Sequence, residues 1–203
     1  MIKKIDENIL NLIDRFDEIP EERKILLDKF ADFISDLLDE NKEVKLTYIC
    51  THNSRRSHMC QIWALTAAEY FGVKTIKSFS GGTEITAFNQ NAVHAVKKFG
   101  FSVNKKDEAN NPLYLVAYSS NREPIECFSK LYSDKSNPQN DFVAIMTCSQ
   151  AEENCPIVFG SIKRFSIQYD DPKIFDGTEH EEEKYSERFE QVGIETLYAF
   201  SKI

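Results

Sequence analysis

The chain has 203 residues, 41% of them hydrophobic, and a formal net charge of −8, which is enough material for one domain with a sizeable core. The acidic balance argues against nucleic acid or an anionic membrane surface as a partner, because both bind basic patches. No run reaches the roughly 20 apolar residues of a membrane span, and the opening MIKKIDENIL is helical and acidic rather than typical of a signal peptide, so we expect a cytoplasmic protein.

Residues 1–43 are predicted to form a helical extension. Apolar residues recur at helical spacing over 5–16 and again over 26–38, and Pro20 lies where the first turn of a second helix tolerates proline. Apolar stripes of this kind are usually buried. We therefore expect an N-terminal helical hairpin that packs on the main domain or on a partner subunit, and the oligomeric state stays open.

From residue 44 onward, strand-like apolar runs alternate with stretches at helical spacing. This alternation predicts a three-layer α/β/α domain with a central parallel sheet over residues 44–203. We expect strands at 44–50, 73–82 and 141–148, and helices at 57–71, 89–99 and 181–203.

Residues 113–133 interrupt this alternation. The sequence LYLVAYSSNREPIECFSKLYS alternates on either side of the turn SSNREP, which predicts an inserted β-hairpin. The insertion could cover a site, form an interface or serve as structural filler, since loops tolerate added length.

The five cysteines are an odd number in a chain without an export signal, which disfavours structural disulfides and favours redox or nucleophilic roles. Paired C-x2-C ligands are absent and the four histidines show no ligand-like spacing, so no metal site is expected. Cys60 and Cys127 are most simply packed thiols.

Cys50 ends the apolar run VKLTYIC and precedes the loop THNSR and a helix. The carboxyl end of a parallel strand is the usual ligand position of an α/β sheet. Loop N–H groups and the positive end of the helix suit a tetrahedral oxyanion, and the planar fork of Arg56 can bind two of its oxygens. The same field should hold Cys50 as a nucleophilic thiolate, to which Ser57 can donate a hydrogen bond.

The segment CTHNSRRS resembles the signature C-x-x-N-x-x-R-S shared by low-molecular-weight protein tyrosine phosphatases and thioredoxin-coupled arsenate reductases. The resemblance covers roughly residues 44–203 and implies the fold of those phosphatases. It also implies that Cys50 is the nucleophile, that Arg56 binds the oxyanion, and that Asp171 of QYDDP, rather than Asp170, protonates the leaving oxygen. The substrate-binding positions that it implies are Thr51, His52, Asn53, Ser54, Arg55 and Ser57.

The segment MTCSQAEENCPI distinguishes the two families, because the phosphatases lack its cysteine pair. In the reductases that it resembles, the residue matching Cys148 attacks the arsenic-bearing nucleophile and releases arsenite. The residue matching Cys155 then forms a disulfide with Cys148, which thioredoxin reduces. If SQAEEN is helical, the two cysteines lie roughly 10 Å apart, farther than the roughly 7 Å between Cα atoms that a disulfide allows. The segment must therefore unwind on oxidation.

Two loop positions depart from the pattern of both families. His52 stands where glycine is usual, so it either strains the backbone or brings its imidazole to the thiolate or the substrate. Arg55 stands where a further cysteine is usual, and either adds positive charge near the oxyanion or is solvated. No cofactor is implied.

Three functions stay open. The favoured one is an arsenate reductase that acts on arsenate and takes electrons from thioredoxin. A second is a low-molecular-weight protein tyrosine phosphatase that acts through a cysteinyl-phosphate. The third is a non-catalytic module that binds phosphate or a similar oxyanion.

Overall fold

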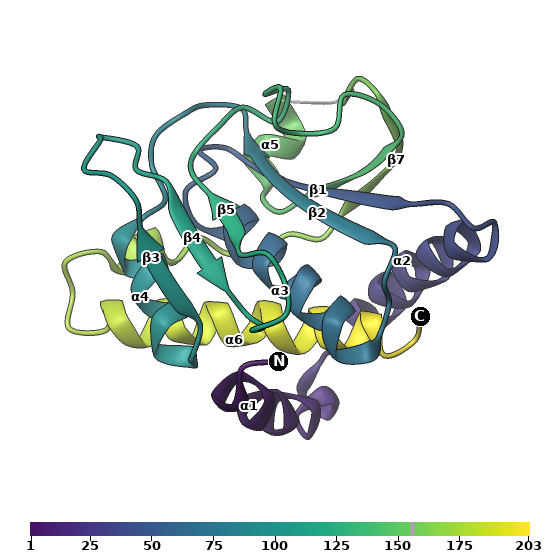
Figure 1. The fold of residues 1–203 in the computed structure, drawn as a ribbon, viewed down its shortest axis with the longest axis horizontal. Coiled ribbons are helices and arrows are strands. Elements are labelled where there is room, and N and C mark those ends of the chain that lie inside the picture. The colour runs from purple at the N-terminus through teal and green to yellow at the C-terminus, as the bar shows by residue number, and fades with distance from the viewer. Residues whose placement is uncertain (155–156) are drawn as a thin grey trace.

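The computed structural model describes residues 1–154 and 157–203. A four-stranded parallel sheet with the order β2-β1-β6-β7 lies at the centre, flanked by helices, which confirms the predicted three-layer architecture (Figure 1). The strands of this sheet are β1 (Val44–Cys50), β2 (Ile76–Gly82), β6 (Phe142–Met146) and β7 (Ser161–Ser166).

The helices occupy the predicted stretches with small shifts at their ends. Asn89 caps one of them by accepting hydrogen bonds from the backbone N–H groups of Asn91 and Ala92, and Gly72 ends another at a left-handed φ of 77°. The α-helices are α1 (Lys3–Ile13), α2 (Glu21–Asp39), α3 (Arg56–Phe71), α4 (Gln90–Phe99), α5 (Ser149–Asn154) and α6 (Glu181–Phe200), with short 3₁₀ turns η1 (Phe16–Glu18) and η2 (Pro172–Phe175).

The predicted β-hairpin is present as part of a second, antiparallel sheet. Its strands β4 (Tyr114–Ala117) and β5 (Ile125–Cys127) pair with each other, and β3 (Ser102–Lys105) adds a third strand. The chain that leaves β5 runs to the end of β2, where Leu131 forms a bridge with Gly82. The insertion therefore reaches the loop after Cys50.

The two N-terminal helices pack against α6, which runs beneath the central sheet (Figure 1). Their buried side chains, such as Ile9 and Phe30, belong to the same hydrophobic cluster as Trp63 of α3 and Phe189 of α6. A side chain at Gly193 would meet the Trp63 ring at 2.6 Å, so glycine permits this close packing. The division of the chain at residue 43 remains a prediction.

No helix in the described part of the chain is both long and apolar enough to span a membrane.

Candidate active site

The loop between β1 and α3 is held by the side chain of Asn53, which is fully buried. Asn53 adopts a left-handed φ of 43°, as expected for a residue type that tolerates this conformation. Its amide nitrogen donates to the Ser57 hydroxyl at 2.9 Å, and its amide oxygen accepts from the backbone N–H of Lys130 at 2.9 Å. The insertion thus supports the loop from outside.

Cys50 lies at the base of this loop and is 3% exposed. Its sulfur is 3.0 Å from the Ser57 hydroxyl, the contact that the sequence predicts. Gly82 lies so close that a side chain there would meet the backbone oxygen of Thr51 and the backbone nitrogen of Asn53, each at 2.7 Å. The loop after Cys50 can therefore close only against a glycine.

The guanidinium of Arg56 is buried and directed to the segment that carries Asp171. Its Nη2 donates to Asp171 Oδ2 at 2.6 Å, and its Nη1 donates to the backbone oxygen of Tyr169 at 3.1 Å. The Nε of Arg56 has no hydrogen-bond partner among residues 1–154 and 157–203. Asp171 also caps η2 by accepting from the backbone N–H of Lys173 at 3.1 Å.

A small cavity of about 10 Å³ lies between Cys50 and Asp171. This volume has room for about one water molecule, and the Asp171 carboxylate occupies Nη2 of Arg56. The side chains that line the cavity are Cys50, His52, Ser54, Arg55, Arg56 and Asp171.

Arg55 is not solvated, which corrects one of the two alternatives for this position. It is 8% exposed, and its Nε donates to the Tyr185 hydroxyl at 2.7 Å while its Nη2 donates to Asp176 at 3.2 Å. The Tyr185 hydroxyl in turn donates to Asp176 at 2.6 Å. Burial and the hydrogen bond to Asp176 raise the pKa of Tyr185 to about 12, so the hydroxyl keeps its proton.

His52 lies at the cavity rim, with its Nε2 3.3 Å from the carboxylate of Glu84. Positive φ at non-glycine positions in the described residues occurs at Asn41, Asn53 and Asp141, so histidine at position 52 brings no left-handed strain. The strain alternative is thus excluded, whereas the contact of the imidazole with the thiolate or the substrate stays a prediction, since its partner in this structure is Glu84.

The hydroxyls of Ser54 and Thr51 have partners in the protein. Ser54 donates to the backbone oxygen of Ala87 at 2.7 Å. The Thr51 hydroxyl lies 3.5 Å from the sulfur of Cys148. These hydrogen bonds help to hold the loop, and the predicted contacts of Thr51 and Ser54 with a substrate stay predictions.

Cys148 lies at the end of the strand next to β1 and is 2% exposed. It shares a hydrophobic cluster with Cys50, and its sulfur accepts from the backbone N–H of Ala151 at 3.4 Å. The following segment SQAEEN forms α5, the helix that the relay would have to unwind. Cys155 lies outside the described residues.

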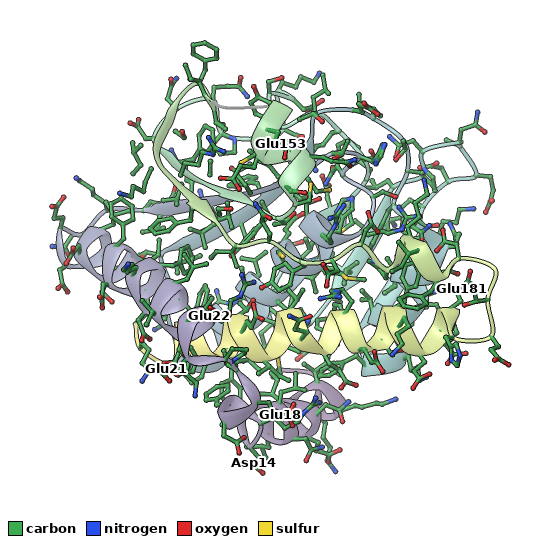
Figure 2. The ribbon with its side chains drawn as sticks, turned by 180° about the vertical axis from the view of Figure 1, so that it is seen from behind. Asp14, Glu18, Glu21, Glu22, Glu153 and Glu181 are labelled. Carbon is green, nitrogen blue, oxygen red and sulfur yellow. The ribbon has the colours of Figure 1, made fainter. Side chains whose placement is uncertain are left out.

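Glu152 fastens α5 to the neighbouring strand. Its carboxylate accepts hydrogen bonds from Ser166 and Gln168 and forms an ion pair with Arg164 at 3.1 Å. Glu153, the next residue, is exposed to solvent (Figure 2). Glu152 therefore makes the polar contacts of α5 to this strand, while Ala151 is buried in the cluster of Cys50 and Cys148.

The other two described thiols are packed in the core, as predicted. Cys60 and Cys127 are buried, and burial raises the pKa of Cys60 well above its usual value and that of Cys127 to about 12. In the described parts of the chain, no three His, Cys, Asp or Glu side chains are grouped to hold a metal ion.

Sequence reasoning missed Tyr169, Asp176 and Tyr185, which hold the two arginines. Asp176 is followed by glycine in an apparent loop, and Tyr185 lies on a helix predicted only for its apolar face. No local pattern marks these partners, because they lie more than 100 residues away from the arginines in the sequence.

Comparisons with known proteins connect this geometry to two groups. The chain is 29% identical over 149 residues to an arsenate reductase of Bacillus subtilis, covering 73% of this chain and 87% of the relative. It is also 29% identical over 127 residues to arsenate reductase 2 of Staphylococcus epidermidis, covering 62% of this chain and 76% of the relative. No family model matches the sequence.

The solved structures that share the fold include low-molecular-weight protein tyrosine phosphatases. One from T. tengcongensis superposes with a TM-score of 0.55 at 16% identity, covering 79% of this chain and 99% of the other. Another from Bacillus subtilis superposes with a TM-score of 0.51 at 15% identity, covering 78% and 96%. At these identities the likeness concerns the fold.

Proposed function

We propose that this chain is an arsenate reductase with a three-cysteine relay, from the superfamily that joins arsenate reductases and low-molecular-weight protein tyrosine phosphatases. The observation that carries the proposal is the meeting of three groups in one place. Cys50 begins the loop that carries Arg56 and shares a hydrophobic cluster with Cys148, whose sulfur is 3.5 Å from the hydroxyl of Thr51, the residue after Cys50. A phosphatase needs the first two groups and has no use for the third.

Oxyanion binding begins with the release of Asp171 from Arg56. Arsenate then accepts hydrogen bonds from the Arg56 fork, including its unpartnered Nε, and from backbone N–H groups of the loop. A buried charged donor without a partner in the described chain is costly unless a ligand pairs with it. This cost supports an anionic substrate at the site.

The first chemical step is attack by the Cys50 thiolate on arsenic. A sulfur–arsenic bond forms and an arsenic–oxygen bond breaks, and Asp171, which takes up a proton from solvent once it has left Arg56, passes that proton to the oxygen, which leaves as water. The Ser57 hydroxyl, 3.0 Å from the sulfur, stabilises the thiolate before attack.

The second step is attack by the Cys148 thiolate on the Cys50 sulfur. A disulfide forms, and the electron pair of the sulfur–arsenic bond stays on arsenic, which leaves as arsenite. Cys155 then attacks Cys148, releases the Cys50 thiolate and forms the disulfide that the thioredoxin dithiol reduces. Arsenate is thus reduced by two electrons that come from thioredoxin.

A phosphatase is the second candidate, because the fold is that of low-molecular-weight protein tyrosine phosphatases. Phosphate and arsenate have nearly the same shape and charge, so the loop alone does not separate the two functions. The cysteine pair does, because hydrolysis of a cysteinyl-phosphate uses water instead of a second thiol.

The test measures arsenate-dependent NADPH consumption with thioredoxin and thioredoxin reductase, beside hydrolysis of p-nitrophenyl phosphate. We expect Cys148→Ser and Cys155→Ser to abolish the arsenate-dependent rate and to retain p-nitrophenyl phosphate hydrolysis. Cys127→Ser is the matched control, because Cys127 is buried in the second sheet, and it should retain both activities.

Arsenate reduction at the wild-type rate in Cys148→Ser would rule out the relay. Hydrolysis of p-nitrophenyl phosphate without any arsenate reduction would favour the phosphatase. Phosphate binding without either activity would favour a non-catalytic oxyanion-binding module.

A further inference from the structure

Arg23 of α2 is directed into the protein, although its neighbours Glu21 and Glu22 are exposed on the first turn of the same helix (Figure 2). The Nε and Nη2 of Arg23 donate to one carboxylate oxygen of Glu195 at 2.9 and 2.7 Å. Glu195 lies on α6 and is 3% exposed. The N-terminal extension is thus joined to α6 by a mostly buried ion pair.

The same guanidinium also holds the segment that leads to Asp171. Its Nη2 donates to the backbone oxygen of Gln168 at 3.0 Å, and its Cζ lies 4.9 Å from the ring centre of Tyr169. The backbone oxygen of Tyr169 accepts the hydrogen bond from Arg56 Nη1 at 3.1 Å. Tyr169 therefore contacts both Arg23 of the extension and Arg56, whose guanidinium would bind the substrate.

We propose that Arg23 is a positioning residue for the oxyanion site, acting through Gln168 and Tyr169 on Arg56 and Asp171. The planar fork of arginine makes the contacts to the carboxylate and to the backbone oxygen together, which a lysine cannot reproduce. The N-terminal extension then helps to position the side chains that bind the oxyanion. This inference rests on the proposed role of Arg56 in binding the oxyanion.

The experiment compares Arg23→Lys and Arg23→Met with the wild-type chain and with Arg15→Met. Arg15 is the matched control because it also joins the extension to α6, through Glu190 at 2.9 Å. Its other side-chain partner is Glu18, which lies on the extension itself. Phosphate affinity is measured by calorimetry. KM and kcat are measured with p-nitrophenyl phosphate as substrate, and thermal unfolding reports whether each variant is folded.

Arg23→Lys keeps a positive charge beside Glu195, so it should stay folded. It should bind phosphate about tenfold more weakly, the change expected when one hydrogen bond that orients a charged group is lost. Arg23→Met should weaken phosphate binding at least as much. Arg15→Met should change melting temperature but leave phosphate affinity and the ratio of kcat to KM within about twofold.

Equal phosphate affinity in Arg23→Lys and the wild type would overturn the inference. So would equal losses in Arg23→Lys and Arg15→Met, because that result means a general effect on stability. A wild-type chain that binds phosphate but neither reduces arsenate nor hydrolyses p-nitrophenyl phosphate would remove the proposed enzyme activity, while the phosphate affinities would still decide the role of Arg23.

Discussion

Asp171 holds two positions in the site, since it pairs with Arg56 at 2.6 Å and caps η2 through Lys173. Asp171→Asn removes the proton donor and weakens the pairing with Arg56. We expect kcat for phenyl phosphate, which has a poor leaving group, to fall by roughly 10²-fold, the usual contribution of a general acid. The fall for p-nitrophenyl phosphate should be smaller, because its leaving group needs less protonation.

Asp170→Asn is the control for this prediction. The Asp170 side chain is 92% exposed and contacts Arg188 at 3.4 Å, away from the cavity. It should retain wild-type kcat with both esters. Equal losses in the two variants would contradict the assignment of the acid to Asp171.

Residues in one local segment could be predicted from the sequence, whereas their distant partners could not. The contact between Ser57 and the Cys50 sulfur was predicted because both residues belong to one short motif, whereas the hydrogen bond from Asn53 to Ser57 was not predicted. Arg55 was left between two alternatives because the partner that settles its position, Tyr185, is 130 residues away in the sequence.

At the scale of elements, α5 is a short helix held through Glu152. Glu152→Gln removes the charge that pairs with Arg164 and weakens the contacts to Ser166 and Gln168. We expect amide hydrogen exchange over residues 149–154 to become about tenfold faster, because local opening then costs less free energy. Exchange is followed by mass spectrometry of peptic fragments.

Glu153→Gln is the matched control, because Glu153 is the exposed neighbour on the same helix (Figure 2). Its exchange rates should equal those of the wild type. If the relay operates, mild oxidation should also yield more of the disulfide between Cys148 and Cys155 in Glu152→Gln than in Glu153→Gln. Identical exchange in the two variants would show that Glu152 does not hold the helix.

The elements missed by sequence reasoning are the ones with the weakest patterns. β3 and β7 carry mostly exposed or half-buried residues, because each lies at the edge of its sheet. An edge strand is defined by the strand it pairs with more than by its own apolar residues. The buried strands β1 and β6 were predictable because both of their faces are covered.

At the scale of the whole molecule, the buried thiol of Cys127 makes the free energy of unfolding depend on pH in the alkaline range. Its pKa is raised to about 12 in the folded chain by burial, whereas an unfolded thiol ionises near about pH 8.5. Its contribution to stability is therefore fully present below about pH 8.5 and is lost as the pH rises toward about 12.

We expect the free energy of urea unfolding to fall between about pH 8.5 and about pH 10.5 in the wild type, and to fall less in Cys127→Ala. Val116→Ala is the control, since it opens a similar space in the same sheet without a titratable group. Its decline with pH should match that of the wild type. Parallel curves for all three proteins would contradict the prediction.

The burial of the extension was predictable from its apolar stripes, but its partner was not. The stripes show which faces of α1 and α2 are covered, while Gly193 of α6, where a side chain would meet Leu12 of α1 at 2.9 Å, determines how closely α6 approaches α1. These contacts join residues near the two ends of the chain. The sequence of the extension alone does not show that α6 is its partner, and the sequence of α6 alone does not show that it packs against the extension.

At the small cavity beside Cys50, the guanidinium of Arg56 already pairs with an anion of the protein itself, the carboxylate of Asp171. If the proposed mechanism operates, each turnover starts as an exchange, in which Asp171 releases Arg56 to the incoming substrate and takes up a proton before it acts as the acid. Until that exchange, the sulfur of Cys50, a residue that is 3% exposed, stays shielded from oxidants in the solvent.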